Sequence, residues 1–162
     1  QFINSYFKKF PEIKNYMSST INFCRKSGYV KNLFGRRIHL RGINDKNFSV
    51  RSFQERAAIN APIQGSAADI IRLAMIEIDK LIEEDKKFRT KMLLQIHDEL
   101  IFECEEKDKD YVQKVIKKAM TSISTSEYHK FSIPLEVNIN SGYNWGEAHW
   151  FNIITPKFWQ FN

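Results

Sequence analysis

The sequence contains few cysteines, prolines and glycines: its 162 residues include 2 Cys, 4 Pro and 6 Gly. Cys24 and Cys104 are too few for a disulfide framework or, by themselves, for a zinc site, so a reducing compartment is expected. No apolar run approaches the ~18 residues that span a bilayer, and the first residues lack the cationic and apolar stretches of a signal peptide. We therefore expect no membrane partner. The chain also begins without Met, which suggests a fragment or a processed product.

Apolar residues are plentiful, since 43% of the chain is hydrophobic and 14% is aromatic. This content excludes a disordered chain, and the length fits one compact domain or part of a larger one. Charge is unevenly spread: residues 1–56 hold 12 Lys and Arg against 3 acids, and residues 57–162 hold 13 against 16. A basic half beside an acidic half suits a polyanion partner next to a cation site. The alternative is solvated surface charge in a lysine-rich protein.

Apolar periodicity and turn residues predict the elements of the N-terminal part. Residues 1–27 are expected to form two helices separated near Pro11, with Gly28 ending the second. The segment 29–40 is expected to form a short hairpin that turns near Gly35. A loop rich in Gly, Asn and Asp follows before the next helix.

A helix is predicted to begin at Val50 and to be kinked or interrupted at Pro62, because proline lacks a backbone donor and clashes with the preceding turn. Ser66, with Asp69 three residues later, fits a variant of the capping box. A second long helix is therefore predicted from there to about Asp85. Its buried stripe is expected to consist of Ala67, Ile71, Ala74, Ile78 and Leu81.

The C-terminal part has one hairpin pattern and one alternating pattern. Residues 91–104 predict two strands joined by a tight turn at or beside His97 and Asp98, and Asp108 is placed to cap the helix that follows. Apolar and polar residues alternate through 133–140, which predicts another strand. Helices and strands packed as layers give an α+β fold with an antiparallel sheet.

The first candidate for chemistry is His97-Asp98-Glu99 at the tip of the predicted hairpin. Adjacent carboxylates at a turn can offer oxygens to Mg²⁺, which takes one or two carboxylates and fills its other positions with water or phosphate. Strand ends would hold those oxygens rigidly for metal-assisted phosphoryl transfer. The alternative is a turn that favours Asp and polar neighbours without any ligand. One local pair also supplies too few ligands for two metals.

Two further sets of side chains point to nucleic acid. Arg56, Asn60 and Gln64 are spaced by four residues, so on an ideal helix they share a face. They offer donors to minor-groove acceptors, which depend little on base sequence. A basic set around the first hairpin would contact phosphates and release counterions. Each set has an alternative as ordinary solvated surface. The basic set consists of Arg25, Lys26, Lys31, Arg36, Arg37 and Arg41.

Four blocks of sequence stand out along the chain: GYVKNLFGRRIHL, QERAAINAPIQGSAADIIRLAM, MLLQIHDELIFE and SGYNWGEAH. Their order and spacing resemble the C-terminal part of family A DNA polymerases, the bacterial DNA polymerase I type. The chain resembles this family from about Phe2 to His149, and the middle two blocks are highly specific. Ile38 stands where a third arginine often follows in the family, and Arg41 where a proline is common.

The resemblance implies a function for the hairpin and its surroundings. Asp98 matches the aspartate that binds the catalytic Mg²⁺ ions, two in the full-length enzyme, and Glu99 matches the carboxylate beside it near the primer end. His97 matches the histidine of the motif, and Gln95 a residue near the primer terminus. The implied partners are primer–template DNA, a dNTP and upstream polymerase segments of the same protein. Further DNA contacts are implied for Arg36, Arg37, Arg56, Asn60 and Gln64.

The resemblance also implies a division of the chain. Residues 1–49 correspond to outer fingers helices with the basic hairpin, residues 50–149 to the C-terminal palm with its antiparallel sheet, and residues 150–162 form an aromatic tail without an assigned role. The family's first polymerase motif, with its second metal-binding aspartate, and the helix that holds the dNTP lie upstream. We therefore expect this chain alone not to polymerise.

The sequence leaves two other functions open. The chain would be a non-catalytic nucleic-acid-binding module if the acidic hairpin binds no metal. A metal-dependent nuclease is less favoured, because no second acidic cluster is placed to complete a site. Frequent Lys, Asn and Ile, with counts of 17, 12 and 20, suggest an AT-rich genome. The expected compartment is the cytoplasm with its nucleoid in a bacterium, or a plastid or mitochondrial matrix in a eukaryotic parasite.

Overall fold

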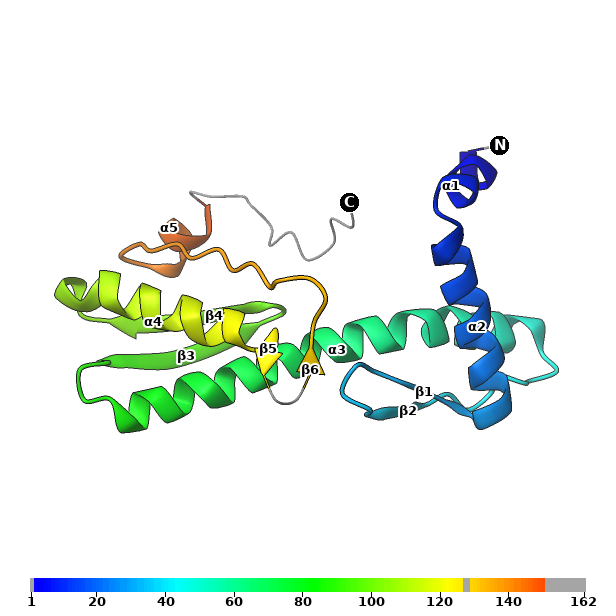
Figure 1. The fold of residues 1–162 in the computed structure, drawn as a ribbon, viewed down its shortest axis with the longest axis horizontal. Helices are drawn as coiled ribbons and strands as arrows, with labels where there is room; N and C mark the ends of the chain where they lie inside the picture. The colour runs from blue at the N-terminus through cyan, green and yellow to red at the C-terminus, as the bar shows by residue number, and fades with distance from the viewer. Residues whose placement is uncertain (1, 127–128, 151–162) are drawn as a thin grey trace. The chain divides into compact units, whose positions relative to one another are not determined.

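The computed structural model describes residues 2–126 and 129–150 and mixes helices with small antiparallel sheets (Figure 1). The α+β fold predicted from the sequence is therefore confirmed. The chain divides into two compact units, Gln1–Ala67 and Ala68–Asn162. This division falls inside one helix and not at residue 50, so the assignment of 1–49 to fingers and 50–149 to palm stays a prediction. Among the described helices, none has the length and apolarity needed to cross a membrane.

The first unit begins with two helices, α1 (Phe2–Lys9) and α2 (Pro11–Ser27), as predicted. Proline is favourable at the first position of a helix, because its fixed φ suits the helix and its missing N–H would have no partner there. Gly28 ends α2 in the left-handed region with φ 76°, and its N–H donates to the Cys24 carbonyl at 2.7 Å. A residue with a Cβ would be strained at this φ.

The predicted basic hairpin is present as β1 (Tyr29–Lys31) and β2 (Arg37–His39), paired antiparallel. Gly35 turns the chain between them with φ 80°. The base of the hairpin is anchored in the first hydrophobic core, since Val30 in β1 and Leu40 after β2 are both buried there. This core consists of Cys24, Val30, Leu40, Ile43 and Ala58.

Helix α3 (Phe48–Glu84) runs for 37 residues as one helix with Pro62 inside it, so the predicted interruption at Pro62 is wrong. The alternative, a kink at Pro62, stays a prediction. Asn47 caps its start, because the Asn47 Oδ1 accepts the Ser49 N–H at 2.9 Å. The predicted capping box at Ser66 is also wrong. Ser66 lies in the middle of α3, and its hydroxyl donates to the Pro62 carbonyl at 2.6 Å. Proline removes one intrahelical hydrogen bond, and the surrounding structure tolerates that loss here.

One tyrosine from α2 ties it to α3 beside this proline. The Tyr16 hydroxyl donates to the Ile59 carbonyl at 2.9 Å, three residues before Pro62. Burial raises the pKa of the Tyr16 phenol because it disfavours the phenolate. The group therefore stays a neutral donor at physiological pH.

The second unit contains the predicted acidic hairpin, formed by β3 (Thr90–Ile96) and β4 (Glu99–Cys104). The strands pair antiparallel with Ile96 opposite Glu99, and the register shifts between Met92 and Leu94. A bulge of this kind increases the local twist of a hairpin.

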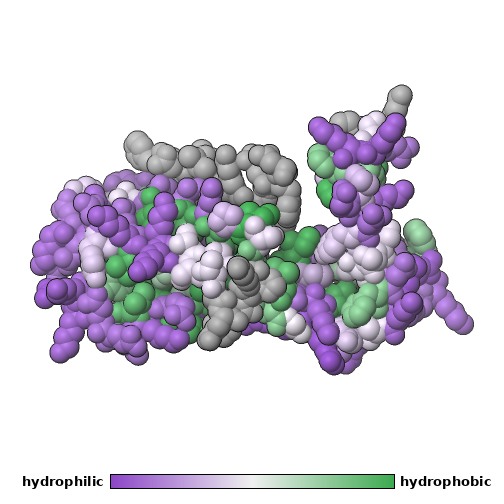
Figure 2. All heavy atoms as spheres, in the orientation of Figure 1, coloured by the Kyte–Doolittle hydropathy of each residue, from purple (hydrophilic) through white to green (hydrophobic). Residues whose placement is uncertain are grey.

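On the face drawn in Figure 2, hydrophobic residues reach the surface of both units among hydrophilic ones.

The hairpin is followed by a 3₁₀ turn, η1 (Glu106–Asp108), and by α4 (Lys109–Ser122). Asp108 stands at the predicted cap position, but its side chain makes no capping hydrogen bond. Helix α4 packs Val112, Ile116 and Ala119 into the second core, while Tyr111 at its start is exposed. That core consists of Ile78, Phe88, Val112, Ile116 and Ala119.

The C-terminal part of the described chain has little regular structure. Two short strands, β5 (Thr125–Ser126) and β6 (His129–Lys130), pair with each other, and α5 (Trp145–Trp150) ends the described residues. The predicted strand at 133–140 is wrong, since no strand is assigned there. Its alternation of half-buried and exposed residues is real, but a strand also needs a neighbour at ladder distance. The aromatic tail beyond Trp150 lies outside the described residues.

The end of α3 is linked to α4 by a hydrogen bond between side chains. The Tyr111 hydroxyl donates to the Asp85 carboxylate at 2.6 Å. This bond and the Lys87 N–H lower the pKa of Asp85, and the same bond raises the pKa of Tyr111. The folded state therefore favours ionised Asp85 together with neutral Tyr111.

Replacing Tyr16 by Phe should lower the free energy of unfolding by about 1 kcal/mol, because a partly buried carbonyl loses its donor. Urea unfolding of the protein that carries this chain would measure the change. Tyr6→Phe is a suitable control, since the aromatic contacts of Tyr6 involve its ring. An equal loss in both variants would contradict a specific role for the Tyr16 bond.

Tyr111→Phe should reduce stability in a pH-dependent manner. A carboxylate with a lowered folded pKa stabilises the fold above its unfolded pKa, about 4, and that stabilisation is lost as pH falls. A phenol with a raised pKa stabilises the fold below about pH 10, and that stabilisation is lost as pH rises through the folded pKa. Melting temperatures from about pH 3 to 11 should therefore differ most between about pH 5 and 9. A difference independent of pH would contradict the coupling.

Candidate functional site

The acidic residues lie at a two-residue turn of the second unit. Because Ile96 pairs with Glu99, the loop between β3 and β4 consists of His97 and Asp98 alone. His97 has φ 53°, in the left-handed region that L-residues seldom adopt, so it is strained. The Gln95 side chain donates to the His97 carbonyl at 3.0 Å and so braces the turn. The two strands thus fix where Asp98 begins to project from the sheet.

The turn leaves its carboxylates accessible to water. Asp98 is exposed and Glu99 is half-buried, while Gln95 and His97 are exposed. Carboxylate oxygens on adjacent residues fit the preference of Mg²⁺ for hard oxygen ligands. Within residues 2–126 and 129–150, no group of three or more His, Cys, Asp or Glu is placed to hold a metal ion. The hairpin by itself therefore supplies too few ligands for a metal ion.

The predicted minor-groove residues lie on α3 in the first unit. Arg56, Asn60 and Gln64 are all exposed. Because α3 continues through Pro62, the spacing of four residues does place them on a common face with modest drift. The Arg56 guanidinium donates to the Ser52 hydroxyl at 2.8 Å, a partner one turn earlier on the same helix. The face presents one cation and two amides to solvent.

The arginines of the basic set around the first hairpin have different partners. Arg36 and Arg37 are exposed, and the Arg37 guanidinium lies over the Tyr29 ring at 4.9 Å from its centroid. This cation–π contact orients the side chain along the hairpin. Arg25, by contrast, forms an ion pair with Glu55 at 2.5 Å. The basic set is therefore not uniformly available to phosphates.

Sequence reasoning missed two buried polar residues in the first unit. Asn32 and Ser66 are 6% and 5% exposed, and both hydrogen-bond to the turn between β1 and β2. No sequence pattern marks Asn32, and the pattern around Ser66 indicates a helix cap. The structure thus groups Gln95, His97, Asp98 and Glu99 on one hairpin of the second unit. The residues of the first unit form their own set: Arg36, Arg37, Arg56, Asn60 and Gln64.

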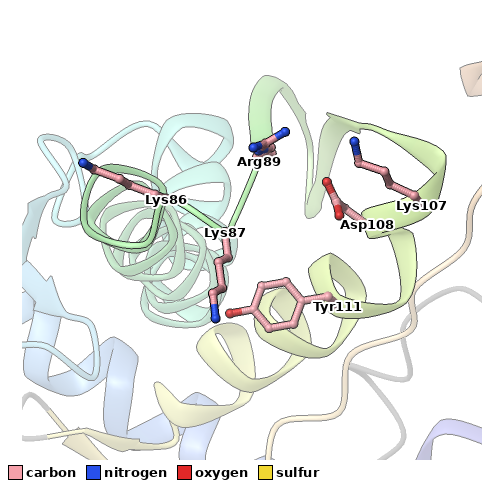
Figure 3. A pocket seen from close by; sticks show the side chains of 6 residues that line it. All are labelled: Lys86, Lys87, Arg89, Lys107, Asp108 and Tyr111. Carbon is pink, nitrogen blue, oxygen red and sulfur yellow. The ribbon is translucent and has the colours of Figure 1, made fainter.

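A hollow of about 430 Å³ in the second unit is lined by cations, and Figure 3 shows its side chains. Glu105 compensates two of these cations, since its carboxylate lies 3.9 Å from Arg89 and 2.5 Å from Lys107. The hydrogen bond from Lys107 lowers the pKa of Glu105. Lys86 extends away from the other labelled side chains in Figure 3. We assign no ligand to this hollow. Its lining residues are Lys86, Lys87, Arg89, Lys107, Asp108 and Tyr111.

Neither cysteine shows the environment of a nucleophile. Burial raises the pKa of the Cys24 thiol, and burial together with the Asp108 charge raises the pKa of Cys104. A raised pKa lowers the fraction of reactive thiolate. Both thiols therefore fit structural roles.

The sequence matches the model of the family described as DNA polymerase family A over residues 1–147. It is 49% identical over 149 residues to DNA polymerase I of Rhizobium leguminosarum, covering 91% of this chain and 15% of that protein. It is 45% identical over 147 residues to DNA polymerase I of Streptococcus pneumoniae serotype 4, covering 91% of this chain and 16% of that protein.

A solved structure, the POL domain of Pol1 from M. smegmatis in complex with DNA primer-template and dNTP, matches with a TM-score of 0.82. The two are 38% identical, and the match covers 90% of this chain and 25% of the other. The chain thus spans about a sixth of the length of its curated relatives. The match over nearly all of its length shows that the chain belongs to DNA polymerase family A.

Proposed function

We propose that this chain is the C-terminal part of a DNA-directed DNA polymerase, and that the larger protein extends a primer by template-dependent nucleotidyl transfer. The observation that carries the proposal is the solvent-facing Asp98 on a two-residue turn between paired strands, in a chain of DNA polymerase family A. The similar Pol1 domain was solved with primer–template DNA and dNTP, which supports the same partners here.

The reaction joins a nucleotide to the primer end. The 3′-hydroxyl oxygen of the primer bonds to the α-phosphorus of the dNTP, the bond from that phosphorus to its bridging oxygen breaks, and pyrophosphate leaves with the electron pair. The hydroxyl gives up its proton to solvent water in this step. Family A polymerases use divalent metal ions, and two Mg²⁺ ions, when bound, would activate the hydroxyl and stabilise the leaving pyrophosphate.

Each candidate residue has a role in this proposal. Asp98 would supply metal-binding oxygens, and Glu99 would support the site near the primer end. Gln95 and His97 would lie near the primer terminus, where the hydrogen bond from Gln95 to the His97 carbonyl fixes the turn. The DNA contacts would come from Arg56, Asn60 and Gln64 in the minor groove and from Arg36 and Arg37 at phosphates.

The roles divide along the chain as the sequence predicts. Residues 1–49 would belong to the fingers and residues 50–149 to the palm, with upstream segments of the same protein supplying the second metal-binding aspartate and the dNTP grip. The described residues hold no complete metal ligand set, so we expect the chain alone not to incorporate nucleotides. The larger protein would work in a bacterial nucleoid, or in a plastid or mitochondrial matrix of a eukaryotic parasite.

In the parent polymerase, Asp98→Ala should reduce nucleotide incorporation by about 10³-fold or more, since a lost metal ligand removes several kcal/mol of transition-state stabilisation. Primer–template affinity should change little. Single-turnover primer extension and fluorescence anisotropy measure the two quantities. Asp79→Ala removes an exposed aspartate from α3 and serves as the matched control. Near-normal extension by Asp98→Ala would favour a non-catalytic binding module.

Gln64→Ala and Arg56→Ala should each weaken primer–template affinity by about tenfold, the loss expected for one or two hydrogen bonds to DNA. Melting temperature should stay within a few degrees of the parent, because both side chains are exposed. Gln113→Ala on α4 is the control for removing a helical glutamine. A fall in stability parallel to the fall in affinity would mean that the two residues are structural.

A further inference from the structure

Two buried polar residues join the tip of the basic hairpin to α3. Asn32 follows β1 and Ser66 lies inside α3, and they are 6% and 5% exposed. Buried polar side chains in folded proteins are almost always hydrogen-bonded. Both of these residues form hydrogen bonds that cross between the turn 32–36 and the helix. We call Asn32 and Ser66 the tip clamp.

The Asn32 amide organises the whole turn. Its Oδ1 accepts the N–H groups of Phe34 at 3.1 Å and Arg36 at 2.9 Å. Its own backbone N–H donates to the Arg36 carbonyl at 3.1 Å, and its carbonyl accepts the Gly35 N–H at 3.0 Å. The backbone of Arg36 is therefore bonded to Asn32 through both its N–H and its carbonyl.

The same turn is bonded to two successive residues of α3. The Asn32 Nδ2 donates to the Gly65 carbonyl at 3.1 Å. The Ser66 hydroxyl accepts the Leu33 N–H at 3.0 Å while donating to the Pro62 carbonyl at 2.6 Å. Ser66 therefore lies in the middle of α3 and does not cap a helix start. Its hydroxyl is used by the Leu33 N–H of the turn and by the Pro62 carbonyl of the helix.

Gly65 lets the hairpin lie directly against the helix backbone. A Cβ on Gly65 would come within 3.0 Å of the Ile38 Cδ1 and 3.6 Å of the Asn32 Cβ. A spacing of 3.0 Å forces the neighbour to shift. Because of this close approach, the Asn32 side chain bridges the backbone of Arg36 and that of Gly65, the residue after Gln64.

The hydrophobic core does not hold this tip. Val30 and Leu40 anchor the base of the hairpin in the first core, whereas Leu33 is 51% exposed and Gly35 is exposed. Without the tip clamp β1 and β2 would stay paired, but the turn 32–36 would lose its bonds to α3. Arg36 and, through the start of β2, Arg37 would then lose their fixed position relative to that helix. Polar bonds thus do at the tip what apolar packing does at the base.

We propose that Asn32 and Ser66 are positioning residues for DNA binding, which fix Arg36 and Arg37 relative to Gln64 so that phosphate and minor-groove contacts form together. The inference rests on the proposed polymerase function. Placing these groups before DNA arrives reduces the entropy lost on binding. The clamp residues themselves need not touch DNA.

The test uses the parent polymerase with Ser66→Ala, which keeps helix propensity but leaves the Leu33 N–H without its acceptor. The dissociation constant for a primer–template duplex should rise about tenfold. In a plot of the logarithm of the dissociation constant against the logarithm of the salt concentration, the slope should fall by about one for each phosphate that is no longer neutralised. Ser66→Thr, which keeps the hydroxyl, should restore both values. Ser19→Ala is the matched control, because that hydroxyl bonds within α2, to the Tyr16 carbonyl.

A double-mutant cycle separates positioning from stability. In a background of Arg36→Ala with Arg37→Ala, adding Ser66→Ala should weaken binding by less than about twofold, since the groups that it positions are gone. A full tenfold further weakening would overturn the proposal, and so would a lowered melting temperature with unchanged affinity. If Ser66→Ala is too unstable to assay, Ser66→Cys replaces it, because a thiol is only a weak acceptor.

The outcomes also distinguish the clamp from the function beneath it. A parent protein that neither binds nor extends a primer–template would contradict the proposed function. A parent that does both, with Ser66→Ala behaving like Ser19→Ala, would contradict the tip clamp alone.

Discussion

The described fold depends on the continuity of one helix, α3, which contributes to both hydrophobic cores. Ala58 and Ile78 are each 0% exposed, and they belong to the cores of the first and second unit respectively. Continuity past Pro62 costs one backbone hydrogen bond, and hydroxyls of Tyr16 and Ser66 bond to carbonyls on this stretch. The common face of Arg56, Asn60 and Gln64 exists only because the helix does not break there.

Features set by local rules were predictable from the sequence. Gly28 and Gly35 adopt positive φ where the sequence predicts a helix end and a turn. In both predicted hairpins, the two paired strands are separated by only a few residues. The course of α3 was not predictable. By local rules, Pro62 indicates a helix break, and Ser66 three residues before Asp69 indicates a helix cap. Contacts between residues far apart in the sequence stabilise a continuous helix instead. Ser66 bonds to Leu33, 33 residues away in sequence, and no spacing pattern reveals such a partner.

The same distinction applies to the alternating segment and to the site. Alternation in 133–140 is matched by a real alternation of exposure along most of the segment, but it does not say whether another strand lies alongside. The hairpin with Asp98 and Glu99 was predictable because its turn and strands are contiguous. The role proposed for Gln95 rests on family resemblance alone, whereas the four-residue spacing of Arg56, Asn60 and Gln64 already pointed to a shared helix face. The contribution of Asn32 was invisible, because a single asparagine in a turn is ordinary and its hydrogen bonds across the turn and to the helix appear only in three dimensions.

The exposure of Asp98 is compatible with the metal-binding role proposed for it. An ionised carboxylate buried without ligands would pay a large desolvation cost, and its pKa would rise until it was protonated. A protonated carboxylate no longer competes for a hard cation. On this exposed two-residue turn, water solvates Asp98, and under the proposed function further oxygens would have to complete the shell of the ion. The backbone strain of the turn falls on His97. The paired strands supply rigidity without burial, so in the proposed function the turn would be ordered before any metal, primer or nucleotide binds.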